Sequence, residues 1–276
     1  MQNDNLKSYF LLHLIVFIWG FTAILGALIS LDALPLVWWR MSLAVVFILV
    51  YIYVKKIPLK IPKKVFFSFL FAGLVIALHW LTFFKAIKVS NVSVTLACLS
   101  TGAFFTSILE PLLFGKKVVW YEVLFGLLVI GGLYIIFNVE VDYVYGIILA
   151  LTSAFLSALF TVINAKFTKE YLPSVISFYE LVGGVGFLSV YLLFTNGFNS
   201  NFFSLSMNDF GWLILLSSIC TAYAFIASVK VMKYLSPYTV MLTINLEPIY
   251  GIILAVLIFF ILDFFKKKTL TRILLN

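Results

Sequence analysis

The chain has 276 residues, of which 64% are hydrophobic and 11% are charged, and its mean hydropathy is +1.15. This composition excludes a disordered chain, which needs low hydrophobicity and high charge density, and a soluble domain, in which about 25% of residues are charged. Two cysteines in apolar runs exclude a secreted disulfide scaffold. An integral membrane protein remains, and in such a protein the net charge of +8 indicates orientation rather than nucleic-acid binding.

Nine apolar runs are long enough to cross a bilayer, which takes about 20 residues of helix. Most connections between them are short, so neighbouring spans run antiparallel. Because backbone groups in lipid must be satisfied internally, the predicted fold is an all-α integral membrane bundle. The nine expected spans are residues 8–30, 34–54, 65–87, 91–114, 119–138, 144–165, 174–195, 210–232 and 238–262.

Lysines are distributed unevenly between the two sets of loops. With the N-terminus inside, the outer loops hold two lysines, Lys85 and Lys88, and the inner segments hold twelve. This asymmetry predicts a multi-pass protein with a cytoplasmic N-terminus. The short loops indicate a bacterial inner (plasma) membrane. The basic tail, residues 263–276, does not fit, because nine full crossings would place it outside. The inner lysines are Lys7, Lys55, Lys56, Lys60, Lys63, Lys64, Lys116, Lys117, Lys166, Lys169, Lys230 and Lys233.

An internal repeat relates two of the turns. Residues 85–88 begin and end with a lysine and precede the turn between the third and fourth spans, and residues 230–233 do the same between the eighth and ninth. The offset is 145 residues (230 − 85 = 145) and corresponds to five spans. Because five is odd, the two copies cross the membrane in opposite directions, as in the inverted repeats of secondary transporters.

Five short motifs occur in order along these spans. They are Trp19 with Gly20 in the first, Trp39 with Arg40 in the second, residues 83–88 at the end of the third, residues 157–162 in the sixth, and Leu246, Glu247 and Pro248 in the ninth. In their order and spacing the chain resembles the EamA-like family of the drug/metabolite transporter superfamily.

The resemblance implies a ten-helix bundle built from two inverted five-helix repeats with both termini cytoplasmic. It also implies a central cavity and transport of small metabolites, often amino acids and frequently outward. Residues 1–138 would then form the first repeat, residues 139–262 the second, and residues 263–276 would replace a tenth span. We therefore expect a chain truncated or altered after about Phe260.

Glu247 is the strongest candidate for substrate binding. Burying an ionisable side chain within a span costs several kcal/mol unless the side chain is paired or hydrated. Such a residue is therefore usually present for a functional or structural purpose. Pro248 would free a backbone carbonyl beside it, and such a site binds a cation, a substrate amine or a proton. The alternative is a structural carboxylate that caps a neighbouring helix or pairs with Arg40.

His79 is the second candidate, and Thr82 lies one turn further along the same helix face. Its alternative is a neutral histidine bonded to a neighbouring carbonyl. Arg40 is interpreted mainly as structural, either pairing across helices or extending to the outer interface. The glycines that follow Glu180 are interpreted mainly as helix packing. Glu180 itself is a weaker candidate than Glu247, because it lies nearer the cytoplasmic interface. The remaining substrate-binding candidates are aromatic or uncharged polar residues: Trp19, Trp80, Thr22, Ser100, Asn245, Tyr250 and Tyr223.

The spans contain no paired basic residues, no phosphate-binding loop, no nucleotide motif and no cluster with metal-ligand spacing. We therefore predict no catalytic residue, no cofactor, no metal and no nucleic-acid partner. The preferred function is a secondary transporter, an exporter, of small metabolites such as amino acids, working by alternating access of two inverted repeats around a midplane cavity. Membrane lipid is a partner, and a coupled proton and a homodimer stay open. The alternatives are a non-transporting remnant and an intramembrane lipid-modifying enzyme.

Overall fold

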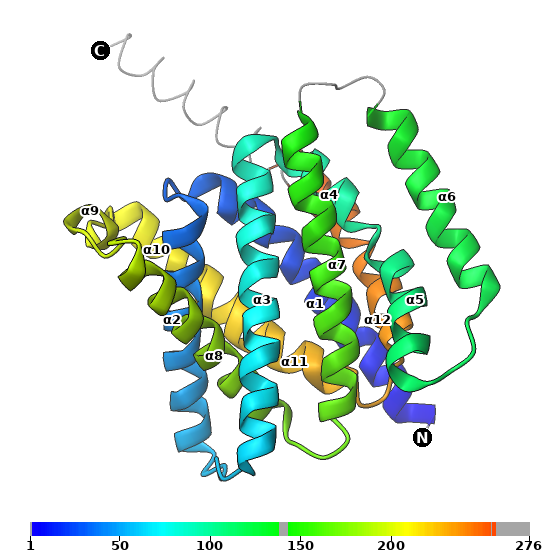
Figure 1. The fold of residues 1–276 in the computed structure, drawn as a ribbon, viewed down its shortest axis with the longest axis horizontal. Helices are drawn as coiled ribbons and strands as arrows, with labels where there is room; N and C mark the ends of the chain where they lie inside the picture. The colour runs from blue at the N-terminus through cyan, green and yellow to red at the C-terminus, as the bar shows by residue number, and fades with distance from the viewer. Residues whose placement is uncertain (1, 138–142, 255, 258–276) are drawn as a thin grey trace, which may run out of the picture.

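The computed structural model describes residues 2–137, 143–254 and 256–257. Its regular elements are helices throughout this part of the chain (Figure 1). They are α1 (Gln2–Leu28), α2 (Ala33–Val54), α3 (Lys63–Val89), α4 (Val92–Leu99), α5 (Gly102–Phe114), α6 (Trp120–Phe137), α7 (Val144–Phe167), α8 (Pro173–Phe194), α9 (Ser200–Phe203), α10 (Met207–Ser217), a π-helix (Ser218–Tyr223), α11 (Ala224–Val231) and α12 (Pro237–Ile244), after which residues 247–254 are helical again.

The predicted all-α membrane fold is confirmed. Within the described residues, seven helical stretches are long and apolar enough to cross a membrane, and α6 contributes a shorter apolar helix over Trp120–Leu133. The expected ninth span, residues 238–262, is interrupted after Ile244, and its end lies outside the described residues. The predicted basic tail, residues 263–276, also lies outside them.

Two of the expected spans are broken in the middle, which the hydropathy pattern did not predict. Residues 100–101 separate α4 from α5, and residues 245–246 separate α12 from the helix that follows. These breaks lie 145 residues apart, as do the N-caps Asn91 and Ser236, whose side chains each accept a hydrogen bond from the backbone amide three residues on. The offset seen in the lysine turns therefore extends to where these helices begin and break.

The expected eighth span is continuous but not uniformly α-helical. A π-helix, Ser218–Tyr223, joins α10 to α11. Thr221 lies within it and donates its hydroxyl to the carbonyl of Leu216, five residues earlier, at 2.7 Å. Single π-turns are often found at functional sites because they redirect side chains that a regular helix would point elsewhere.

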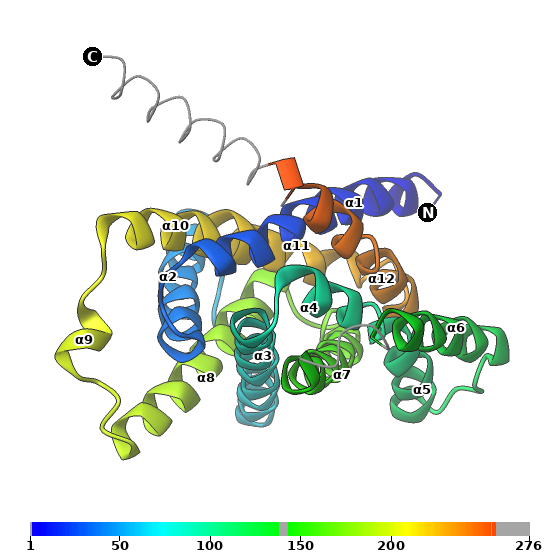
Figure 2. The same cartoon turned by 90° about the horizontal axis from the view of Figure 1, so that it is seen from above.

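Helix α3 lies in the middle of the bundle, between α7 and α8, and α6 and α9 lie at opposite edges (Figures 1 and 2). At the contact with α8, a Cβ added to Gly73 would lie 2.9 Å from the backbone nitrogen of Gly184, so only glycine fits. Gly183 meets the backbone of Leu70 equally closely, whereas a Cβ on Gly186 would meet open space. The packing interpretation is therefore confirmed for two of these three glycines.

The segments predicted to be inner gather at one end of the molecule. Figure 1 shows the N-terminus on the same side as the loops that join α2 to α3, α5 to α6, and α7 to α8. At this end Lys116 forms an ion pair with Glu110, with Nζ 2.9 Å from Oε1. The fold thus collects the lysine-bearing loops on one face.

Candidate functional site

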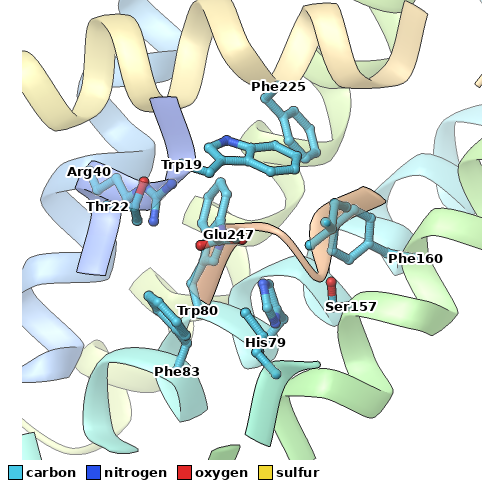
Figure 3. A pocket seen from close by; sticks show the side chains of 12 residues that line it. Trp19, Thr22, Arg40, His79, Trp80, Phe83, Ser157, Phe160, Phe225 and Glu247 are labelled. Carbon is cyan, nitrogen blue, oxygen red and sulfur yellow. The ribbon is translucent and has the colours of Figure 1, made fainter. Parts of the chain in front are cut away.

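A narrow cavity of about 40 Å³ lies inside the bundle, where side chains from both halves of the chain meet (Figure 3). Its walls come from α1, α2, α3, α4, α7, α11 and α12 and from the helix after the second break. The lining residues are Trp19, Thr22, Arg40, His79, Trp80, Phe83, Leu99, Ser157, Phe160, Phe225, Ile244 and Glu247.

Five of the nine predicted substrate-binding residues line this cavity: Glu247, His79, Trp19, Trp80 and Thr22. They are distant in sequence, and helix packing brings them together. The cavity also includes Arg40, which the sequence led us to interpret as structural, and several apolar and aromatic side chains that hydropathy alone did not single out.

The other four candidates lie elsewhere. Ser100 and Asn245 occupy the two helix breaks, and the side-chain oxygen of Asn245 is buried without a hydrogen-bond partner among the described residues. The ring of Tyr250 packs edge-on against Phe17, with centroids 5.8 Å apart. Tyr223 is half exposed and borders a separate groove between α1, α2 and α11.

Glu247 opens the helix that follows the second break and is 5% exposed. Pro248 lies in the first turn of this helix and has no N–H to donate to the carbonyl of Ile244, four residues earlier. The interruption at residues 245–246 therefore lies beside Pro248, where the sequence predicts a free backbone carbonyl. A carboxylate at a helix N-terminus is favoured by the helix dipole. No hydrogen bond or ion pair joins the Glu247 carboxylate to another described side chain, including Arg40.

Arg40 is 1% exposed and faces the cavity. Its Nε donates to the hydroxyl of Thr221 at 2.7 Å, and its guanidinium carbon lies 3.9 Å from the ring centre of Trp80. Nη1 has no hydrogen-bond partner among the described residues. The interpretation that Arg40 extends to the outer interface is therefore wrong: neighbouring helices enclose it, although it lies only two turns into α2.

The π-helix positions two of these cavity residues. Thr221 holds the guanidinium of Arg40, and the backbone carbonyl of Cys220 accepts a hydrogen bond from Nε1 of Trp19 at 3.2 Å. Both contacts come from one short segment whose backbone departs from the α-helical pattern. Sequence reasoning missed this feature, because nothing in the composition of residues 218–223 distinguishes a π-turn from an ordinary helix.

His79 is anchored to α7. Its Nδ1 lies 2.9 Å from the backbone oxygen of Ser153 and 2.8 Å from the hydroxyl of the same residue. The predicted alternative, a histidine bonded to a neighbouring carbonyl, is the arrangement observed. Thr82 does not share the cavity: its hydroxyl donates to the carbonyls of Leu78 and His79, and it borders an outer groove instead.

Comparison with known proteins identifies the family. The sequence profile of the EamA-like transporter family matches residues 6–138 and again residues 144–262. The chain belongs to the EamA-like transporter family. Sixteen chains of solved structures resemble it, among them one described as "Crystal structure of protein", with a TM-score of 0.71 at 13% identity over 92% of this chain and 89% of the other. At this identity the likeness shows the fold alone. No curated protein sequence matches the chain.

This EamA-like transporter is therefore a multi-pass membrane protein of a family that moves small solutes. In the conformation described, its cavity has room for about three water molecules, which is too little for an amino acid. Within the described residues no group of three His, Cys, Asp or Glu side chains lies close enough to hold a metal ion.

Proposed function

We propose that this EamA-like transporter is a secondary transporter that exports small metabolites such as amino acids by alternating access. The observation that carries the proposal is Glu247, a buried carboxylate that faces a cavity at a helix break and forms no hydrogen bond or ion pair within the described part of the chain. Buried ionisable groups in spans usually mark a substrate or ion pathway. Transporters commonly form their binding sites from discontinuous helices near the midplane.

We further propose that residues 1–138 and 139–262 act as the two inverted repeats. The breaks at residues 100–101 and 245–246 support this division, because they recur at one offset in the two halves. Both halves also line the cavity. A rocking movement of one repeat against the other would widen the cavity and open it to each side in turn. The lysine-rich end would then face the cytoplasm of a bacterial cell, together with the N-terminus.

In this mechanism Glu247 binds the substrate amine or a coupled proton, and it exchanges one for the other as the repeats rock. His79 and the aromatic walls shape the space around it. A neutral carboxylic acid is cheap to bury, whereas a carboxylate needs a cation, so the empty carrier would return protonated. The proton coupling and the homodimer stay predictions.

The test is counterflow of radiolabelled amino acids into proteoliposomes that contain the purified protein. We expect accumulation with the wild-type chain and loss of at least about 90% of it with Glu247→Gln, because the amide carries no charge. The matched control is Glu170→Gln, the same chemical change in an exposed loop, which should transport normally. Undiminished counterflow by Glu247→Gln would refute the role of Glu247. Absence of counterflow by a folded wild-type protein with every amino acid would contradict the proposed function.

A further inference from the structure

A groove of about 470 Å³ lies on the side of the bundle, between α1, α2 and the continuous segment formed by the π-helix and α11. Figures 1 and 2 show α11 between α2 and the N-terminal part of α1. The groove is separate from the central cavity, because none of the described residues lines both. Its volume is within the range of about 300–1,000 Å³ in which proteins bind small ligands.

The groove opens on a surface that faces lipid. Helices α1 and α2 are both long and apolar enough to cross a membrane, and both carry exposed apolar side chains beside the groove. On α1, Phe10 is 70% exposed and Leu14 is 47% exposed, and on α2, Val46 and Val50 are each more than half exposed. Inside a bilayer, the molecules that reach such an opening are lipids.

One end of the groove is basic. Lys230 lines it, lies in the last turn of α11 and forms no ion pair with a carboxylate of the described residues. Lys7 precedes the lining residue Leu11 by four positions on α1, and Lys55 follows the lining residue Tyr51 by four positions at the end of α2. Residues four apart lie on the same helix face. Each of the three walls therefore brings a lysine to the same end.

The length of the groove matches one leaflet. Its lining extends from Ser218 in the π-helix to Lys230 (230 − 218 = 12), which is about 18 Å at about 1.5 Å per residue. Half of the hydrocarbon core is about 15 Å thick. Between these two residues the floor is apolar and includes Ala222 and Ile226. A charge at the helix end and an apolar track toward the midplane are the features of a phospholipid, in reverse sign at the head.

We propose that this groove binds one anionic phospholipid of the leaflet at the lysine-rich end. Its phosphate lies at Lys230, and one acyl chain follows the π-helix and α11. Basic pockets between membrane helices on the cytoplasmic side bind anionic head groups in this way. A zwitterionic lipid offers the same acyl chain without a net charge, so it is bound less tightly. The inference goes beyond the proposed transport function and does not depend on it.

The lipid would contact the segment that positions a cavity side chain. Ser218 and Ala222 line the groove, whereas Thr221, between them in the same π-helix, accepts the hydrogen bond from Nε of Arg40. The two sites are thus on opposite sides of one short segment.

The experiment is native mass spectrometry of the purified full chain, released from detergent and titrated with matched probes. The probes are palmitoyl-oleoyl phosphatidylglycerol, phosphatidylcholine with the same two acyl chains, and glycerol phosphate as the head group alone. We expect the wild-type protein to bind phosphatidylglycerol at least about tenfold more tightly than phosphatidylcholine. Glycerol phosphate should neither bind nor compete at the same concentrations, because it lacks the acyl chain.

The variants separate the head group from the chain. Lys230→Gln should weaken phosphatidylglycerol binding about fivefold and leave phosphatidylcholine binding unchanged. The matched control is Lys233→Gln, the same change in an exposed lysine at the same end that does not line the groove, and it should have less than about half of this effect. Ala222→Leu should weaken both lipids, because the larger side chain fills the groove. Ser218→Leu replaces it if Ala222→Leu does not fold.

Several outcomes would contradict the inference. Equal affinity for the two lipids, or equal effects of Lys230→Gln and Lys233→Gln, would exclude recognition of the head group at Lys230. Unchanged lipid binding by a folded groove-filling variant would exclude the groove as the site. Full competition by glycerol phosphate would indicate a site for soluble phosphate instead. A dimer without bound lipid would indicate that a second copy covers the groove, and a folded monomer that binds neither lipid would indicate another part of the chain.

Discussion

The chain contains two Glu-Pro dipeptides in apolar surroundings, and they have different environments. Glu110 in α5 is 7% exposed, and Glu247 after the second break is 5% exposed. Glu110 accepts a hydrogen bond from Lys116 at 2.9 Å through Oε1 and one from the backbone amide of Tyr238 at 3.1 Å through Oε2. Glu247 has no hydrogen-bond or ion-pair partner among the residues that the structure describes.

The partners of Glu110 explain its presence without any ligand. Its second oxygen meets the first turn of α12, where orphan amide groups and the helix dipole favour a negative charge. Glu110 thus ties α5 to the start of the broken helix. Glu247 is equally buried but forms no hydrogen bond or ion pair with the described residues. Burial of a carboxylate therefore does not by itself distinguish a structural role from the binding role that we propose for Glu247.

The largest expected effect separates the two carboxylates. Glu247→Gln should reduce transport on the order of 100-fold with little change in melting temperature, because Glu247 forms no hydrogen bond or ion pair with the described residues that glutamine would lose. Glu110→Gln should do the reverse, with a lower melting temperature and normal transport per folded molecule. Counterflow normalised to the folded fraction, together with thermal unfolding of each variant, measures both. Equal loss of transport per folded molecule in the two variants would contradict the assignment of a binding role to Glu247 and a structural role to Glu110.

A truncation at Glu110 sharpens its structural role. Glu110→Ala should destabilise the protein by about 2 kcal/mol, because the amides at the start of α12 lose a charged acceptor. This value is well below that of a fully buried ion pair, since the side chain of Lys116 is 58% exposed and water screens it. Chemical denaturation in mixed micelles checks the loss, with Glu170→Ala as an exposed control. A change below about 0.5 kcal/mol would contradict the capping role.

The N-caps extend the comparison to the broken helices themselves. Asn91→Ala and Ser236→Ala should each cost about 1 kcal/mol, because each removes a side-chain acceptor from the first turn of a short helix. We expect similar losses, since the two caps lie at the same 145-residue offset as the helix breaks and make the same type of hydrogen bond. Differential scanning fluorimetry of both variants measures them. If only one of the two variants lost stability, the two caps would have the same geometry but would contribute differently to the stability of the protein.

The smallest effect on stability is expected from a change of Lys116, the exposed partner in the ion pair with Glu110. Lys116→Gln should change stability by less than about 1 kcal/mol, because Lys116 is largely hydrated and Glu110 keeps its hydrogen bond from Tyr238. The change should shrink further in high salt, which screens exposed charges. If Lys116→Gln were as harmful as Glu110→Ala, the ion pair and not the helix cap would be the important contact.

Much of the fold was readable from hydropathy. Apolar runs located the membrane helices to within a few residues, for example 65–87 against Lys63–Val89 and 174–195 against Pro173–Phe194. The lysine turns also carried the offset of 145 residues that the two helix breaks repeat. These features are local, because each depends on the side chains of one segment and on the lipid or water around it.

For the site, the sequence by itself singled out the unusual groups, such as Glu247 and His79, because a charge or a titratable ring within an apolar run stands out against its neighbours. It did not determine which of them face one another. Arg40 and Trp19 owe their positions to a π-turn more than 170 residues away in the chain, and Thr82 faces a different groove from His79. Only the packing of the helices decided this, because a side chain's partners depend on how whole helices are rotated and crossed, and hydropathy does not record that rotation.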